Sequence, residues 1–129
     1  MPPPAIGLRH LALNVSDVPR AEAFYVGVLG FTVEWRPDPD NLYLHLGDDN
    51  LALHRAGGEL APVQRLAHLG IVVPRPEDVD AWEAHLRAHG VTLLAAPRTH
   101  RDGARSCYVI DPDGNAIQII HHPPISGKI

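Results

Sequence analysis

The sequence lacks several features that would assign it to a broad functional class. Of its 129 residues, 11 are Lys or Arg and 15 are Asp or Glu, so the formal net charge is −4. No basic surplus is available to hold phosphate backbones, which argues against nucleic acid as a partner. No apolar run approaches the roughly 20 residues of a membrane helix, and the opening MPPPAIG has neither region of a signal peptide. We therefore expect a cytoplasmic protein.

Cysteine is also scarce, with one copy at position 107. A single cysteine excludes a disulfide framework within the chain. The apolar stretch RSCYVI around Cys107 is typical of a strand, which predicts a small buried side chain rather than a catalytic thiol. Histidine, by contrast, occurs nine times, although His85, His89 and His100 fall where loops or solvent-facing positions are expected. Composition alone therefore only raises the question of a metal site.

The length predicts one domain, because 129 residues can bury one core but not two independent ones. Within that domain the sequence repeats: GLRHLALNV and RLAHLGIVV are both apolar strands, with His10 and His68 at corresponding places. We expect the single domain 1–129 to consist of module one at about 7–55, a connector at about 56–65, module two at about 66–122 and a loose tail at 123–129.

Each module follows the same plan of strand, helix and three further strands. In module one, Ser16 or Asp17 can cap a helix that ends at Gly30. In module two, Pro76 opens a helix that ends at Gly90. The strands expected after each helix are FTVEWR, NLYLHLG and NLALHRA in module one, and VTLLAAP, ARSCYVI and NAIQII in module two.

One helix can cover only one face of each sheet. The modules should therefore turn their uncovered faces toward a common hollow. The expected fold is α+β, with two βαβββ modules forming a partly closed, barrel-like cleft of mixed sheets.

Period-two alternation assigns the faces of the strands. In the first strand, Leu11 and Leu13 should pack under the helix, and the residues between them should face the other way. The same reasoning in the other strands predicts a polar set on the uncovered faces: His10, Asn14, Tyr43, His45, His54, His68 and Gln118. Because His10, His54, His68 and Gln118 place three imidazoles and one amide oxygen on four separate strands, we expect a metal or small-molecule site there.

The pairing of strands decides which of these residues are neighbours. In module one, a two-residue loop at 48–49 would place Tyr43 opposite His54 and His45 opposite Ala52.

In module two, a four-residue DPDG turn would set Cys107 opposite Gln118, whereas a bulge would bring Tyr108 there. The sequence leaves this second register open.

Taken together, these motifs resemble the vicinal oxygen chelate superfamily, which includes glyoxalase I, methylmalonyl-CoA epimerase, fosfomycin-resistance thiol transferases, extradiol dioxygenases and bleomycin-resistance proteins. The resemblance runs from about Gly7 to His122 and is carried by HLALNVSDVPRAEAFYVGVLGF, HLGIVV and YVIDPDGNAIQII. It implies that βαβββ modules pair around one divalent metal ion, often across a homodimer, and we expect a homodimer here. The metal ligands that it implies by position are His10, His54, His68 and Gln118.

Gln118 departs from the resemblance, because enzymes with this turn motif usually have Glu. A Gln side chain can bind a metal through its amide oxygen but cannot accept a proton as a carboxylate can. Neutral ligands leave the ion its full charge, which favours an anionic substrate and Lewis-acid chemistry or activation of water. Glu34 could serve as a substitute base. The residues do not distinguish Zn, Ni, Mn, Fe or Co.

Two functions are compatible with the sequence. The first is a glyoxalase-like metal-dependent enzyme, of lyase, isomerase or transferase type, acting on a small oxygen-rich or anionic substrate. The second is a metal-free protein that binds a small molecule or drug, as bleomycin-resistance proteins do. Gln118 favours the second, and the aligned histidines favour the first. For the enzyme, the candidate catalytic residues are Glu34 and Tyr43, and the candidate substrate contacts are Asn14, His45 and either Cys107 or Tyr108.

Overall fold

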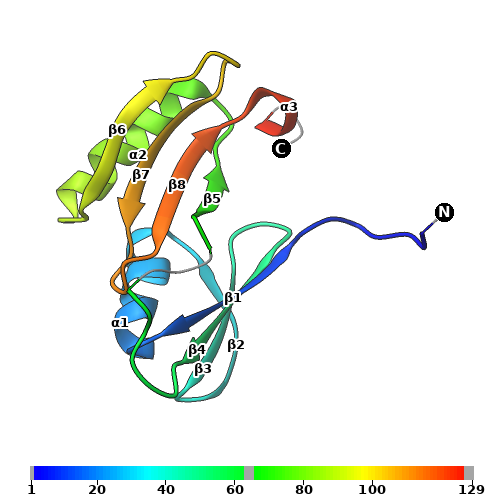
Figure 1. Ribbon diagram of the computed structural model, residues 1–129, viewed down its shortest axis with the longest axis vertical. Coiled ribbons are helices and arrows are strands. Elements are labelled where there is room, and N and C mark those ends of the chain that lie inside the picture. Colours follow the sequence, from blue (N-terminus) through cyan, green and yellow to red (C-terminus); the bar gives the residue numbers. More distant parts are fainter. Residues whose placement is uncertain (1, 63–65, 127–129) are drawn as a thin grey trace. The chain divides into compact units, whose positions relative to one another are not determined.

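A computed structural model describes residues 2–62 and 66–126, and it divides into two compact units, residues 1–60 and 61–129. Each unit holds one four-stranded mixed sheet with helices, as the internal repeat predicts (Figure 1). The boundary between the units falls inside the predicted connector. Residues 63–65 of that connector and 127–129 of the predicted tail lie outside the described residues.

The elements of unit 1 are, in chain order, β1 (His10–Val15), α1 (Val18–Glu22), the π-helical segment η1 (Ala23–Val28), β2 (Thr32–Asp38), β3 (Asn41–His45) and β4 (Asn50–Arg55). The sheet order is β1-β4-β3-β2, with β1 parallel to β4 and the other pairs antiparallel. Asp17, one of the two predicted caps, accepts a hydrogen bond from the backbone N–H of Arg20 at 3.0 Å. The helical segment ends before Gly30, which has a φ of +87°.

The elements of unit 2 are β5 (Leu69–Val72), α2 (Pro76–Ala88), β6 (Leu93–Thr99), β7 (Arg105–Ile110), β8 (Ala116–His121) and α3 (Pro123–Ser126). The sheet order is β5-β8-β7-β6, with β5 parallel to β8, so unit 2 repeats the topology of unit 1. Among the described residues, no helix is both long and apolar enough to cross a bilayer.

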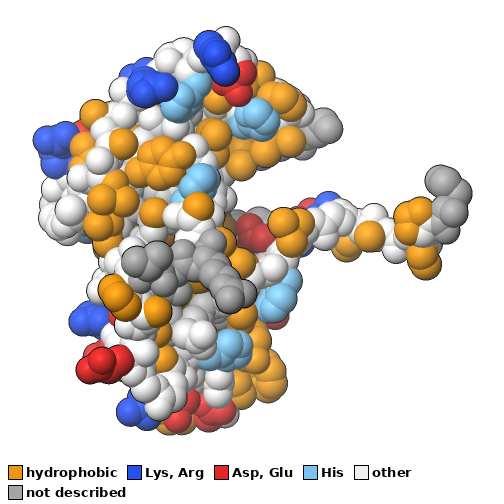
Figure 2. Space-filling model, in the orientation of Figure 1, with side chains coloured by type: hydrophobic (Ala, Val, Ile, Leu, Met, Phe, Trp, Pro, Cys, Tyr) orange, Lys and Arg blue, Asp and Glu red, His pale blue; other side chains and the backbone are white. Residues whose placement is uncertain are grey.

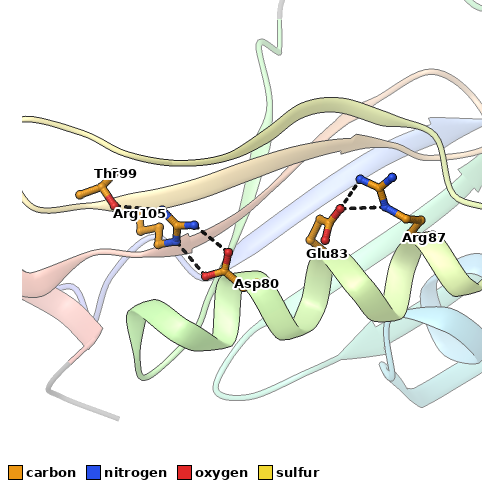
Figure 3. Close-up of polar contacts among 5 residues, drawn as sticks. All are labelled: Asp80, Glu83, Arg87, Thr99 and Arg105. Carbon is orange, nitrogen blue, oxygen red and sulfur yellow. Dashed lines mark hydrogen bonds and ion pairs between the residues drawn. The ribbon is translucent and has the colours of Figure 1, made fainter.

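Polar contacts fasten α2 along one face of the sheet of unit 2 (Figures 1 and 3). The guanidinium of Arg105, on β7, donates to both carboxylate oxygens of Asp80 on α2, at 2.9 and 2.6 Å, and also to Thr99 on β6 at 3.0 Å. Glu83 and Arg87 pair along the helix itself. Arg105 lowers the pKa of Asp80 below its ordinary value by hydrogen bonding to its charged form. This face of the sheet is therefore the one that α2 covers.

The predicted alternation of buried and uncovered side chains is confirmed in β1, β3 and β8, whereas in β4 Ala52 is buried as well as Leu51 and Leu53. In β1, Leu13 and Val15 are buried, whereas His10, Ala12 and Asn14 are exposed. Large buried side chains fill the corresponding faces of the other strands: Leu42, Leu44, Leu51 and Leu53 in unit 1, and Val109, Ile117 and Ile119 in unit 2. We call the face of each sheet opposite these buried side chains its open face.

The hairpin between β3 and β4 is longer than the sequence predicts. β3 ends at His45 and β4 begins at Asn50. The side chain of Asp49 accepts hydrogen bonds from the backbone N–H groups of Leu46 and Gly47, at 2.7 and 3.2 Å. The carboxylate therefore stabilises a wider connection than a two-residue loop.

This loop shifts the strand register by two residues. Tyr43 lies opposite Ala52 and His54 lies opposite Asn41, so the predicted pairings of Tyr43 with His54 and of His45 with Ala52 are wrong. A shift of two residues keeps every side chain on its own face, because side chains alternate with a period of two. The face assignment therefore survives the error in register.

Candidate functional site

The strand pairings allow the two units to be compared residue by residue. Ala12 lies opposite Ala52 in unit 1, and Gly70 lies opposite Gln118 in unit 2. Ala12 and Gly70 each follow the histidine of their repeat by two positions. Ala52 is therefore the counterpart of Gln118, and unit 1 carries a methyl group where unit 2 carries an amide.

His54 is not brought to His10 by this register. His10 lies opposite Asn50, and His54 lies opposite Asn14, so the two histidines stand at opposite ends of the paired strands. At about 3.3 Å per residue, four positions amount to roughly 13 Å. Imidazole nitrogens bind zinc at about 2.0 Å, and side chains that stand perpendicular to a sheet do not span such a gap. Within unit 1, His54 is therefore not a second ligand for an ion on His10, contrary to the ligand set expected from the sequence.

His10 instead begins a hydrogen-bonded relay on the open face. Its Nδ1 atom lies 2.7 Å from Oδ1 of Asn50, and Nδ2 of Asn50 donates to Oε2 of Glu34 at 3.2 Å. Because an amide oxygen only accepts, Nδ1 carries the ring proton, and Nε2 of the neutral imidazole keeps its lone pair. Glu34 therefore supports His10 through Asn50.

His10 and Glu34 also line an open depression of about 550 Å³ in unit 1. His45 lines the same depression, together with Asp48 and Asp49 of the hairpin loop. Two of the predicted catalytic and substrate-contact residues, Glu34 and His45, are thus brought beside His10.

A second relay of the same kind lies at the other end of this sheet. Nδ1 of His54 lies 2.6 Å from Oδ1 of Asn41, and Nδ2 of Asn41 donates to both carboxylate oxygens of Asp38 at 2.9 and 3.0 Å. The ring of Tyr43 packs edge-on against His54 at 5.9 Å and stacks on Trp35 at 5.2 Å. Trp35 is 58% exposed, so this aromatic stack reaches solvent. Neither relay was predicted from the sequence.

In unit 2, the pairing resolves the register that the sequence left open. Tyr108, rather than Cys107, lies opposite Gln118. Nε2 of Gln118 donates to the hydroxyl of Tyr108 at 2.9 Å, and the ring of His68 packs edge-on against Tyr108 at 5.2 Å. Oε1 of Gln118 lies beside Gly70, 3.7 Å from where a Cβ atom would stand. His68, Tyr108 and Gln118 are therefore neighbours on one face.

Cys107 lies on the opposite, helix-covered face of unit 2, where it is fully buried and opposite Ile119. Burial raises the pKa of the Cys107 thiol to about 11, and the nearby carboxylates of Glu83 and Asp80 act in the same direction. The sequence alternative that placed Cys107 among the substrate contacts is thus not supported. The prediction of a small buried side chain is confirmed.

The donors available for a metal ion form two partial sets. Within residues 2–62 and within residues 66–126, no three His, Cys, Asp or Glu side chains gather into a possible metal site. Unit 1 offers Nε2 of His10, and unit 2 offers His68 and Oε1 of Gln118. Imidazole and amide donors suit a divalent transition metal, so their chemistry fits such an ion. Figure 2 shows that His side chains reach the surface over both units.

Known proteins share this sequence pattern. The model of the Glyoxalase/Bleomycin resistance protein/Dioxygenase superfamily matches residues 7–119. The metallothiol transferase FosB of Bacillus licheniformis is 27% identical over 121 residues, which cover 88% of this chain and 74% of FosB. A 2,2',3-trihydroxybiphenyl dioxygenase of Sphingomonas paucimobilis is 30% identical over 120 residues, which cover 88% of this chain but only 40% of the dioxygenase.

Solved structures share the fold. A lactoylglutathione lyase from Agrobacterium tumefaciens aligns with a TM-score of 0.76 and 21% identity, covering 92% of this chain and 96% of the lyase. A glyoxalase/bleomycin resistance protein/dioxygenase from Alicyclobacillus acidocaldarius aligns with a TM-score of 0.70 and 24% identity, covering 90% and 91%. At these identities the likeness shows the fold alone.

Proposed function

Since the chain belongs to the glyoxalase/bleomycin resistance protein/dioxygenase superfamily, we propose that it is a metal-dependent enzyme whose divalent ion is bound by His10, His68 and Gln118. Its substrate is small and presents oxygen atoms or an anionic group to the ion. The observation that carries the proposal is the relay behind His10. Asn50 occupies the Nδ1 side of the ring, so the Nε2 lone pair is left for a ligand bond.

The bound ion would supply Lewis-acid chemistry, polarising a substrate oxygen or activating water. The chain's own groups position the reactants. Tyr108 holds the Gln118 amide by accepting from its Nε2 atom, and this leaves Oε1 as the donor atom. His45 and Glu34 line the depression next to His10, and we assign proton transfer to one of them. We assign Tyr43 to the side of the site that contacts the substrate.

The three-ligand proposal is tested by elemental analysis of protein purified without a His tag and without added metal. We expect one equivalent of a transition metal in the wild type, and its loss in His10→Ala and in His68→Ala. His54→Ala is the matched control, because His54 has the same kind of Asn support but stands roughly 13 Å from His10. Metal retained in His10→Ala would overturn the proposal.

One surface feature needs its own control in that experiment. His85 lies in the last turn of α2 and His89 is the C-cap residue of that helix, with the two ring centroids 4.4 Å apart. Two imidazoles so placed can take up a divalent ion without any functional site. The analysis should therefore be repeated in a His85→Ala, His89→Ala background, where we expect the same single equivalent.

The reaction type is tested with metal-loaded protein and substrates that correspond to the named activities of the relatives. These are lactoylglutathione, a thiol with an electrophilic acceptor, and 2,2',3-trihydroxybiphenyl. Turnover of one class that is abolished in His10→Ala would assign the reaction. No turnover of any class by fully loaded protein would favour the second function.

That second function is a metal-free protein that binds a small molecule or drug. Two observations favour it: Ala52 stands where unit 2 has Gln118, and the Trp35–Tyr43 stack offers a solvent-exposed aromatic surface. Bleomycin added to metal-free protein should then quench Trp fluorescence. Trp35→Phe should remove most of that signal, whereas Trp82→Phe, on α2, should leave it unchanged.

We also propose that the protein is a homodimer. The open face of unit 1 exposes His10, Ala12 and Trp35, and exposed sheet faces with large apolar side chains seldom remain uncovered. Sedimentation at micromolar concentration should show a dimer. A purely monomeric protein would contradict this assignment.

A further inference from the structure

We propose that Asn50 and Glu34 are positioning residues that make His10 a metal ligand by fixing the tautomer of its ring. The ligand role of His10 rests on the proposed function. The relay itself does not, and can be tested in the metal-free protein.

Glu34 stands at the end of the relay. The carboxylate of Glu34 only accepts hydrogen bonds, so it selects the NH₂ side of the Asn50 amide, which lies 3.2 Å away. Asn50 must then present Oδ1 to His10, and Nδ1 of that ring lies 2.7 Å from it. An oxygen without a proton requires N–H on the ring, so the proton sits on Nδ1. A neutral imidazole free in water prefers the opposite tautomer, with the proton on Nε2.

The consequence concerns metal binding. In the tautomer favoured in water, Nε2 carries a proton and cannot bind a metal until that proton moves. The relay places the lone pair on Nε2 before any ion arrives, and it orients the ring at the same time. His10, His68 and Gln118 are all neutral ligands. Glu34 adds a negative charge on the Nδ1 side of the His10 ring.

The relay is not a requirement of the βαβββ fold, because unit 2 has the same strand pairings without it. Asn50 precedes Ala52 by two positions, and Ala116 precedes Gln118 by two. Ala116 is therefore the counterpart of Asn50. The counterpart of Glu34 is Leu94. Glu34 lies at the register shift between Val33 and Trp35, and Leu94 lies at the equivalent shift between Leu93 and Ala95. Neither Ala116 nor Leu94 can continue a hydrogen-bonded relay.

The His54 relay provides a control within the same sheet. His54, Asn41 and Asp38 repeat the chemistry of His10, Asn50 and Glu34. The same argument assigns Nδ1–H to His54. His54 is not in the proposed ligand set, however, so disturbing its relay should change a tautomer without changing metal affinity.

The first experiment is long-range ¹H–¹⁵N NMR of the metal-free protein at about pH 8, above the ordinary His pKa of about 6.5. In the wild type, His10 and His54 should both be in the Nδ1–H form. Asn50→Ala should return His10 alone to mainly Nε2–H, and Asn41→Ala should do the same for His54 alone. Glu34→Ala should give a mixture at His10. Because Glu34 is exposed and Asn50 partly so, the backbone spectrum should stay native.

The second experiment titrates the same proteins with Zn²⁺. We expect Asn50→Ala to weaken binding about 10- to 100-fold, the usual cost of losing a group that supports a ligand. Asn41→Ala should bind as the wild type does.

The outcomes separate the two proposals. A wild-type protein that binds no Zn²⁺ would defeat the proposed function, while the NMR result still decides the relay. An unchanged His10 tautomer in Asn50→Ala would overturn the relay. A changed tautomer with unchanged Zn²⁺ affinity would overturn its positioning role.

Discussion

The two units share their strand pairings but differ in the chemistry of their open faces. Tyr43 and Tyr108 are counterparts: the first lies opposite Ala52 and stacks on Trp35, whereas the second lies opposite Gln118 and binds its amide. The buried faces differ less, because both must fill a core at close-packed density: Leu53 and Ile119 are both large and apolar, although Cys107 stands where unit 1 has Leu42. The comparison indicates that packing has kept the two halves alike where they are buried.

The open faces of the two units carry different groups that could bind a ligand. In unit 1, His10 is hydrogen-bonded to Asn50, and the position that corresponds to Gln118 holds only the buried methyl group of Ala52. Unit 2 presents Gln118 but, with Ala116 in place of Asn50, does not orient His68 through a relay. Among residues 2–62 and 66–126, no three His, Cys, Asp or Glu side chains gather into a possible metal site.

The largest effects are expected from the buried counterparts Leu53 and Ile119, which are both fully buried. Leu53→Ala and Ile119→Ala should each lower the free energy of unfolding by about 2–5 kcal/mol, because each leaves a cavity in its core. Urea unfolding followed by fluorescence and circular dichroism would measure the losses. We expect one transition in both variants. Two separate transitions would show that the units fold independently and break the single-domain prediction.

A smaller change in the free energy of unfolding is expected from the titration of Cys107. Its counterpart Leu42 has no titratable group. The pKa of the Cys107 thiol is raised in the folded protein from an ordinary value of 9.0 to about 11. The folded state therefore holds this proton more tightly than the unfolded state. The protonated thiol therefore stabilises the folded state below pH 9. This stabilisation, roughly 3 kcal/mol of the free energy of unfolding, is lost as the pH rises toward 11.

This pH dependence is measured as the free energy of unfolding between pH 8 and about 11. Cys107→Ala is the reference, since other groups titrate in the same range and only the difference between the two proteins reports the thiol. Equal slopes for both proteins would contradict the assignment.

An added carboxylate tests whether Ala52 and Gln118 are true counterparts. Gln118→Glu should tighten Zn²⁺ binding by about 10-fold or more, or about 1.4 kcal/mol, because an anionic oxygen replaces a neutral one. Ala52→Glu should also tighten binding, with Ala52→Gln as the uncharged control of similar size. Competition with a chelator would measure both affinities. A response at Gln118 without one at Ala52 would break the equivalence.

The smallest effect is expected from transplanting the relay into unit 2. Ala116→Asn combined with Leu94→Glu should give His68 the support that His10 has, and Leu94 is exposed enough to be replaced. His68 should shift toward the Nδ1–H form in long-range NMR, with at most a few-fold gain in Zn²⁺ affinity. Ala116→Asn alone is the control and should shift His68 less. No shift in the double variant would mean that side-chain identity alone does not account for the difference between the units.

Much of the fold was predictable because it depends on local patterns. Helix ends at Asp17 and Gly30 follow from capping and from positive φ, and the buried faces follow from alternation. The hairpin length was not predictable in the same way, since it depends on which backbone groups Asp49 binds. The longer hairpin goes with a register that differs by two residues from the predicted one, and this changes the neighbours of His54.

The candidate site shows the same division. The repeat placed His10 and His68 at matching positions, and the face of Gln118 followed from the pattern of its strand. The sequence did not decide whether Cys107 or Tyr108 lies opposite Gln118, because the sequence of a strand does not fix its register with the neighbouring strand. The two relays join residues from different strands, and Asn41 and Asn50 carry no mark in the sequence that identifies them as supports for histidines.

The order of residues along the chain determined the duplicated βαβββ plan, the caps and the covered face of each sheet, since these depend on neighbours within a few positions. Tertiary structure alone decided which atoms meet across strands. That Nδ1 of His10 faces an amide oxygen, that Tyr108 holds Gln118, and that His54 stands far from His10 all depend on register. Register is set by the competition of whole strands for hydrogen bonds and burial.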